Sequence, residues 1–198
     1  MTSISKERIG AISDGVIAVA ATLLVIDLEV PDGVTMTNEL VFHWSRVFAA
    51  WIISFIMIVA VWLDNHLFLS KARDWSVPLT ILTFLQLGAV SLIPFASDLV
   101  IDHYESQAAM LTFNAVLMLN GIASYAICRT LVRGTAFLDD AQAADALHRR
   151  GQRQLIIYAL VLVLASTAGY LQHPMVGIIC WALSPILISL TARFSRTA

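Results

Sequence analysis

The first apolar stretch of the chain starts with polar residues whose types suit chemistry or helix positioning. Arg8, Ser13 and Asp14 place a base, a hydroxyl and a carboxylate at its beginning. A polar side chain inside a membrane helix is costly, so it indicates a functional role. Arg8 and Asp14 are six residues apart and lie on different faces of an ideal helix, which predicts partners on another helix. The alternative is that Ser13 or Asp14 caps a helix beginning at Gly15.

A second polar group ends the next apolar stretch. Trp62 and His66 are four residues apart and share a helical face, and Asn65 lies between them. A Trp at this depth is often only an interfacial anchor, and a His there is often solvated. We interpret the two groups together as one hydrogen-bonded cluster at the inner leaflet that fixes the pose of the first helix. Its members are Arg8, Ser13, Asp14, Trp62, Asn65 and His66.

The composition indicates which kind of protein carries these residues. Of 198 residues, 59% are hydrophobic and 13% are charged, whereas about 25% are charged in a soluble domain. This excludes an ordinary soluble globule, and the high hydrophobicity excludes a disordered chain. The formal net charge of −2 gives no basic excess for nucleic acid, and the two cysteines have no partner at metal-ligand spacing. The sequence predicts an all-α, polytopic membrane protein with no metal site and no nucleic-acid partner.

Six stretches are candidates for membrane-spanning helices. Such a helix needs about 20 mostly apolar residues, and the first stretch meets this length only with its polar start. The alternative for that stretch is a signal peptide, but no small-residue cleavage site follows Leu28. Residues 130–154, the longest interior loop, are expected to form a short amphipathic or solvated helix at the inner surface. One six-helix domain over residues 1–198 is predicted, with spans at about 10–29, 46–68, 77–97, 108–128, 153–172 and 174–192.

The charged residues orient the six spans. Of the twelve Lys and Arg residues, only Arg46 falls on the outer side of this arrangement. Because basic residues collect on the cytoplasmic side of membrane proteins, both termini are predicted to lie in the cytoplasm. The outer loops are acidic, with Asp27 and Glu29 at the outer end of the first helix.

The first helix also carries a stripe of side chains at positions i, i+3, i+4 and i+7, namely Val19, Thr22, Leu23 and Ile26. Periodicity alone is equally compatible with a stripe that faces lipid or the core. Small residues on its flank permit close approach of neighbouring helices. If several copies of this helix surrounded an axis, Asp27 and Glu29 would form an acidic ring above a narrow apolar constriction.

The start of the first helix resembles a known family signature. Arg8, the segment Ser13-Asp14-Gly15 and the apolar run after it are similar to the first helix of the prokaryotic relatives of the lysosomal potassium channel, the transmembrane protein 175 family. That family has a basic residue, then Phe-Ser-Asp-Gly and an apolar run. Here Ile12 replaces the usual Phe, and Ile17 replaces a second common Phe. Trp62 and His66 at the end of the second stretch also match a family feature.

The resemblance implies a potassium-selective channel, a homotetramer whose pore is lined by the first helix of each subunit. Family members lack the Thr-Val-Gly-Tyr-Gly filter, and this chain has no such segment. Hydrophobic rings act instead as gate and filter, and they correspond to Val19, Leu23 and Ile26, with Thr22 at the family's threonine. The resemblance also implies the cytoplasmic membrane of a prokaryote, contact with membrane lipid, and no cofactor other than the permeant potassium ion.

The outer acidic residues, the polar cluster and Val19 each have an expected role in such a channel. Asp27 and Glu29 would raise the local cation concentration at the outer mouth. The six-residue polar cluster would support the first helix and its gating without binding ions. Val19 stands where Ile or Leu is usual, so the inner constriction is expected to be slightly wider than in those members.

Two other classes of protein are alternatives. A small secondary transporter or proton-coupled cation carrier would place ionisable groups or broken helices near the membrane midplane. The deep segments hold amides such as Gln86 and Asn114 there, but no acid or base. An enzyme would need a nucleophile with a base, or metal ligands at one depth. The five His residues are scattered and no catalytic residue is identified, so we expect a channel and not an enzyme.

Overall fold

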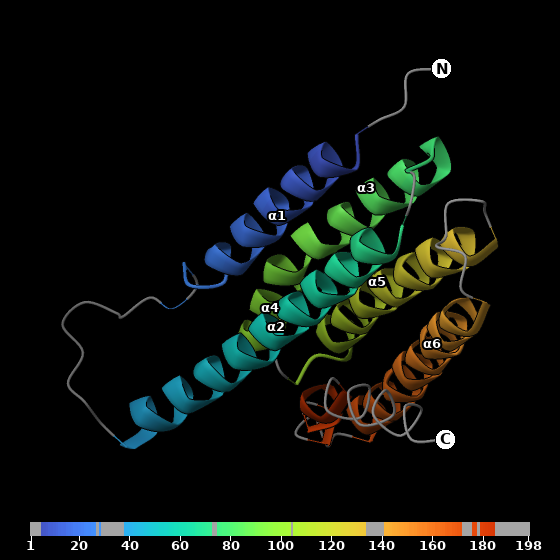
Figure 1. Ribbon diagram of the computed structural model, residues 1–198. Helices are drawn as coiled ribbons and strands as arrows, with labels where there is room; N and C mark the ends of the chain where they lie inside the picture. The colour runs from blue at the N-terminus through green and yellow to red at the C-terminus, as the bar shows by residue number, and fades with distance from the viewer. Residues whose placement is uncertain are drawn as a thin grey trace.

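The structure, a computed structural model, describes residues 5–26, 28, 38–72, 75–103, 105–133, 141–171, 176–177 and 179–184. Within these residues the chain is a bundle of α-helices with no β-strand, which confirms the predicted all-α class. The helices are α1 (Lys6–Leu23), α2 (Asn38–Lys71), α3 (Val77–Ser91), α4 (Ile93–Asp102), α5 (Gln107–Arg133) and α6 (Ala141–Tyr170). In Figure 1, α1 lies beside α2 and α3 on one side of the bundle, and α6 packs on α5 on the other.

The start of α1 is fixed by a cap at Ser5. Its hydroxyl accepts a hydrogen bond from the Arg8 backbone N–H (3.3 Å) and donates one to the Glu7 carboxylate (2.7 Å). The second bond lowers the pKa of Glu7, and a carboxylate is favourable at a helix N-terminus. Ser13 and Asp14 therefore lie inside α1, and the alternative that either of them caps a later helix is wrong.

A tighter turn follows the end of α1 at Leu23. The N–H groups of Val25 and Ile26 donate to the carbonyls of Thr22 (3.2 Å) and Leu23 (3.0 Å). Bonds to the carbonyl three residues back are typical of a 3₁₀ turn, which often closes an α-helix. The α-helix therefore begins and ends earlier than the predicted span 10–29.

The predicted span 77–97 consists of two helices and not one. α3 and α4 meet at Leu92, because Pro94 has no N–H to donate to the Val90 carbonyl and its ring crowds the preceding turn. Near the start of α4 the proline is tolerated, since that N–H would have no intrahelical partner in any case. The two helices still make one apolar segment, Val77–Asp102, long enough to cross a membrane.

The prediction of a separate, short surface helix within residues 130–154 is wrong. α5 continues to Arg133, and residues 141–154 are the first turns of α6, which runs on without a break to Tyr170. Arg150 and Gln154 of this segment turn toward the bundle because they have a buried partner there, described below, whereas Asp145 and Arg149 are exposed. α5 and α6 also approach closely at a glycine: a Cβ on Gly121 would lie 2.5 Å from the Tyr158 ring.

Four helical segments among the described residues are long and apolar enough to cross a membrane. They are Val47–Lys71, Val77–Asp102, Gln107–Arg133 and Ala144–Tyr170, and they correspond to the second to fifth predicted spans. α1 is helical as predicted, but its charged first turn and Asp14 lower its apolar character. The predicted sixth span, 174–192, lies largely outside the described residues.

The buried apolar side chains form two separate clusters. The large cluster includes Ile17, Val61, Leu87, Phe113 and Val161. The small cluster includes Ile9, Phe68, Leu79, Cys128 and Leu147. Because α1, α2, α3, α5 and α6 each contribute to both clusters, the clusters lie at different levels of the same bundle.

Candidate functional site

One face of α1 is apolar and points away from the bundle. Val19 is 57% exposed, Leu23 40% and Ile26 62%, while the opposite face buries Ile9, Ser13, Ile17 and Ala20. The Thr22 hydroxyl donates to the Val19 carbonyl (2.9 Å), so it is satisfied within the helix. Within a membrane, such a face meets either lipid or another protein surface.

Ile12 extends this face toward the start of α1. It is also exposed and precedes Val19 by seven residues, which is close to two helical turns. In the sequence Ile12 stands out only as a departure from the family pattern, although the seven-residue spacing places it on the same face as Val19. We define the outward stripe as Ile12, Val19, Leu23 and Ile26. Asp27 and Glu29, the predicted outer-mouth acids, lie outside the described residues.

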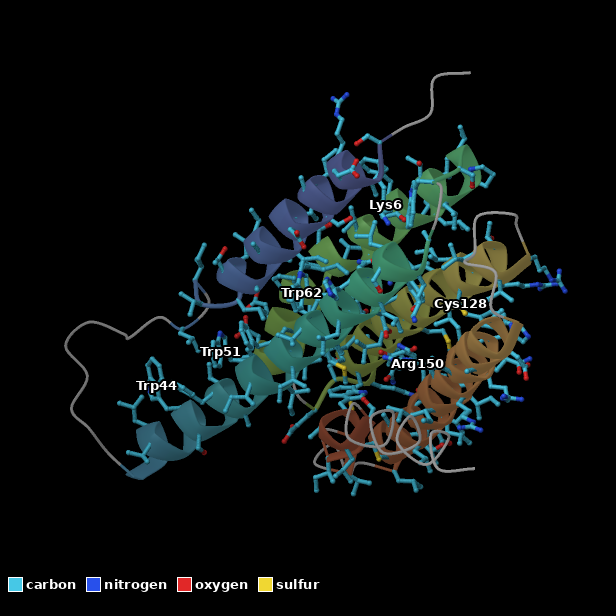
Figure 2. The ribbon with its side chains drawn as sticks, in the orientation of Figure 1. Lys6, Trp44, Trp51, Trp62, Cys128 and Arg150 are labelled. Atoms are coloured by element: carbon cyan, nitrogen blue, oxygen red, sulfur yellow. The ribbon has the colours of Figure 1, made fainter. Side chains whose placement is uncertain are left out.

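Part of the predicted polar cluster is assembled. The Trp62 indole N–H donates to the Asp14 carboxylate (2.8 Å), which ties α2 to α1, and Trp62 lies between these helices in Figure 2. The Trp62 and His66 rings stack with centroids 5.8 Å apart and planes at 26°. Asp14, Trp62 and His66 therefore form a connected row along the α1–α2 contact.

The other three members of the predicted cluster are not joined to this row. Arg8 is exposed, and its side chain has no hydrogen bond or ion pair with the residues that the structure describes. Ser13 and Asn65 are buried, and the Ser13 hydroxyl and the Asn65 side-chain NH₂ find no partner in the described part of the chain. A different contact secures the start of α1: Lys6 donates to the Ala72 carbonyl (2.9 Å) at the end of α2.

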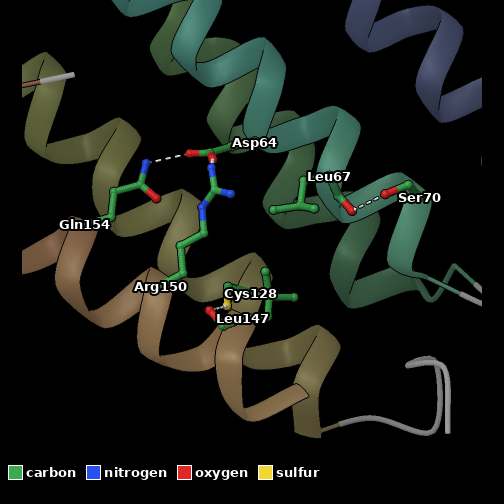
Figure 3. Close-up of polar contacts among 7 residues, drawn as sticks. All are labelled: Asp64, Leu67, Ser70, Cys128, Leu147, Arg150 and Gln154. Atoms are coloured by element: carbon green, nitrogen blue, oxygen red, sulfur yellow. Dashed lines mark hydrogen bonds and ion pairs between the residues drawn. The ribbon is translucent and has the colours of Figure 1, made fainter. Parts of the chain in front are cut away.

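A buried ion pair centred on Asp64 was not predicted from the sequence. This carboxylate is 4% exposed and accepts hydrogen bonds from Arg150 (2.9 Å) and from the Gln154 side-chain amide, both on α6 (Figure 3). Two signals were available in the sequence. Asp64 is a lone carboxylate in an apolar stretch, and Arg150 and Gln154 are four residues apart on one helical face.

Two further polar contacts join helices within the apolar core. Asn114 donates to the Ser166 hydroxyl (3.1 Å) and accepts from the Trp181 indole N–H (2.8 Å). Ser54 donates to Ser97 (2.9 Å). Among the described residues, no group of three or more His, Cys, Asp and Glu side chains is placed to hold a metal ion. The arrangement therefore positions the helices relative to one another, and α1 carries an exposed apolar face, as the other helices of the bundle also do.

Comparisons with known proteins agree on one family. The family model described as the endosomal/lysosomal potassium channel TMEM175 matches residues 8–94, from α1 to the start of α4. A potassium channel of Streptomyces collinus is 30% identical over 168 residues, which cover 80% of this chain and 81% of that protein. A potassium channel of a Chryseobacterium species is 24% identical over 172 residues, 84% of each chain.

A mammalian relative and a solved structure extend the likeness. The bovine endosomal/lysosomal proton channel TMEM175 is 27% identical over 203 residues, which cover 87% of this chain and 41% of that longer protein. The crystal structure of a lysosomal potassium-selective channel TMEM175 homolog from Chamaesiphon minutus has the same fold. Its TM-score is 0.80 at 23% identity, with 94% of this chain and 97% of that one covered. This chain is 30% identical to the Streptomyces collinus protein over most of the length of both, and it is a multi-pass membrane protein of the TMEM175 channel family.

Proposed function

We propose that the protein is a potassium-selective ion channel whose subunits assemble as a homotetramer around a pore lined by α1. The observation that carries the proposal is the outward stripe, an apolar face on the helix where the family match begins. Two relatives that match most of the chain are named potassium channels. In a tetramer, four copies of the stripe would face one another across the axis.

The outward stripe supplies the gate and the filter in this proposal. Val19, Leu23 and Ile26 are three or four residues apart, so four subunits would stack their side chains as apolar rings about 5–6 Å apart. An apolar constriction of this kind blocks ions by dewetting and conducts after a small widening. Because potassium loses its hydration water at lower cost than sodium, a mostly dry constriction favours potassium. The Thr22 hydroxyl donates its hydrogen to the Val19 carbonyl, which leaves its oxygen lone pairs free. Thr22 therefore adds a polar position beside the apolar rings of the constriction.

The orientation of the channel follows from the charges. Of the twelve basic residues only Arg46 falls on the outer side of the predicted arrangement, so we place both termini in the cytoplasm. The relatives from Streptomyces collinus and a Chryseobacterium species support the cytoplasmic membrane of a prokaryote as the location. Fourfold Asp27 and Glu29 at the outer mouth would then concentrate cations before they enter. The Asp14–Trp62–His66 row holds the pose of α1 in this proposal and takes no part as an ion ligand. Arg8, Ser13 and Asn65 are likewise not ion ligands, although the Arg8 side chain, the Ser13 hydroxyl and the Asn65 NH₂ make no hydrogen bond to the described residues.

Two structural features favour a channel over a carrier. Carriers bind substrates at unwound helix segments, whereas the break at Leu92 keeps a backbone close to helical (φ −87°, ψ −10°). Carriers also need an acid free to exchange a proton or cation, and Asp64 is occupied by Arg150 and Gln154. Neither feature offers a substrate site.

The experiment that tests the proposal is a current recording from the purified protein in a planar bilayer, with potassium on one side and sodium on the other. We expect discrete single-channel steps and a reversal potential displaced toward the potassium equilibrium. Leu23→Ala should reduce this displacement, whereas Leu160→Ala, at an exposed apolar site on α6, should not. Slow counterflow in liposomes without single-channel steps would contradict the proposal and favour a carrier.

Protons are a second candidate for the permeant ion, because the bovine relative is named a proton channel. The same recording with equal potassium on both sides and a pH gradient separates the two. A reversal potential that follows the pH gradient would show proton conduction. A reversal potential that stays at zero would restrict permeation to the metal cations.

A further inference from the structure

Buried polar side chains lie between the two apolar clusters in each helix that contributes to both clusters. Between their apolar contributions, α1, α2, α3, α5 and α6 each bury at least one polar residue. We define the polar layer as this set: Ser13, Asp64, Asn65, Thr83, Gln86, Asn120, Ser124 and Gln154. The recurrence at the same place in five helices indicates a continuous feature of the bundle and not isolated buried polar residues.

The polar layer has an anchored part and a part without partners. The anchored part is Asp64 with its donors Arg150 and Gln154, which joins α2 to α6. On the α1 and α3 side, the hydroxyls of Ser13 and Thr83 and both amide atoms of Gln86 have no hydrogen-bond partner within the described ranges. Gln86 is completely buried, so the bulk solvent does not reach its amide.

Two further groups in the layer also lack partners among the described residues, and one of them is a hydrogen-bond donor while the other is an acceptor. The Asn65 NH₂ is a donor, and the Asn120 carbonyl oxygen is an acceptor. Buried polar groups in native proteins are almost always hydrogen-bonded. These donors and acceptors, which neighbouring helices bury between the same two clusters, therefore require partners other than the described side chains. Such partners must include both donors and acceptors.

We propose that the polar layer binds a cluster of internal water molecules between α1, α2, α3 and α5. Water donates and accepts, and buried water makes two to four hydrogen bonds to such groups, at about one molecule per 27 residues. A cation would lack a counter-charge, because Asp64 is the layer's carboxylate among the described residues and Arg150 already neutralises it. The ligand is therefore neutral water and not a metal ion.

The bound water would change how α1 is held. On the α2 and α6 side the layer is fixed by direct bonds between side chains, whereas Ser13 of α1 would be held through water. Water molecules rearrange their hydrogen bonds as the groups around them move. The polar layer would therefore let the facing groups of α1 and α3 rearrange, within the limits set by the Trp62–Asp14 bond that ties α1 to α2. This inference does not depend on which ion, if any, the protein conducts.

The test is water-edited solid-state NMR on the full-length protein in lipid bilayers. The measurement follows magnetisation from water protons to side-chain NH₂ groups. We expect a build-up several-fold faster at Gln86 and Asn65 than at Asn114. Asn114 is the matched control, because it is an equally buried amide whose oxygen and nitrogen both have protein partners.

A variant identifies the NMR signal of the Gln86 side chain. Gln86→Met removes the amide at similar side-chain length and identifies the Gln86 signal by its loss. If that variant does not fold, the Asn65 signal of the unmodified protein decides the test against Asn114. Transfer to Gln86 and Asn65 as slow as transfer to Asn114 would show that the layer is dry and would overturn the proposal.

Discussion

Asp64 is a buried carboxylate that depends on two donors from α6. Removing one donor leaves part of its charge uncompensated, and the cost of such a loss exceeds the worth of the bond itself. Arg150 is about one-third exposed, so solvent replaces some of its stabilisation. We predict that Arg150→Met lowers the free energy of unfolding by about 1–3 kcal/mol, measured as a fall in the thermal unfolding midpoint in detergent micelles.

The chain offers a matched control one residue away. Arg149 pairs with Asp145 on the exposed face of α6, where both side chains are more than half exposed. Exposed pairs of this kind contribute about 0–1 kcal/mol, so Arg149→Met should leave the unfolding midpoint nearly unchanged. Equal shifts for the two variants would mean that burial of Asp64 has no energetic consequence.

The hydrogen bond from the Trp62 indole N–H to Asp14 can be tested by removing its donor alone. Trp62→Phe keeps a ring against His66 but removes the donor to Asp14. We predict a destabilisation of about 1–2 kcal/mol, because a hydrogen bond to a carboxylate is stronger than one between neutral groups. The control is Trp51→Phe, since the Trp51 N–H has no partner among the described residues. A larger loss for Trp51→Phe, by thermal unfolding, would contradict the assignment.

At the scale of helices, the close approach of α5 and α6 depends on a glycine. An Ala at position 121 would place its Cβ against the buried Tyr158 ring, which must then shift. We predict that Gly121→Ala destabilises the bundle by about 1–3 kcal/mol, as overpacking of a tight contact does. Gly88→Ala is the control, because nothing lies within 4 Å of that Cβ, and Ala should stabilise α3 by up to about 1 kcal/mol. Chemical unfolding that gave both variants the same sign would refute this account.

The helices could be predicted from the sequence where one local signal dominates. Long apolar runs predicted the four helical segments that are long and apolar enough to cross a membrane, and the i, i+4 spacing predicted the Trp62–His66 contact. Local signals failed where a distant partner decides the structure. Residues 141–154 are polar enough for a surface helix, yet they continue into α6 because Arg150 and Gln154 bond to Asp64, more than eighty residues earlier.

The break at Leu92 and the start of α1 had local signals that were given too little weight. Pro94 lacks the N–H that a continuous helix requires, and Ser5 followed by Glu7 is typical of a helix N-terminus. The separation of Arg8 from the polar cluster had no such signal, because side-chain exposure depends on how α1 packs. The exposed face of α1 could be proposed from the family pattern but not from the periodicity of the sequence alone.

At the scale of the whole molecule, the proposed pore depends on how wide its narrowest ring is. Val19 places a smaller side chain on the outward stripe than the Ile or Leu expected there, so four copies would leave a wider constriction. Dewetting depends steeply on such widths. We predict that Val19→Ile lowers single-channel conductance and raises selectivity for potassium over sodium in bilayer recordings. Val163→Ile, at an exposed site on α6, should change neither quantity. Unchanged conductance and selectivity in Val19→Ile would place the narrowest ring elsewhere on α1, with Leu23 the next position to test.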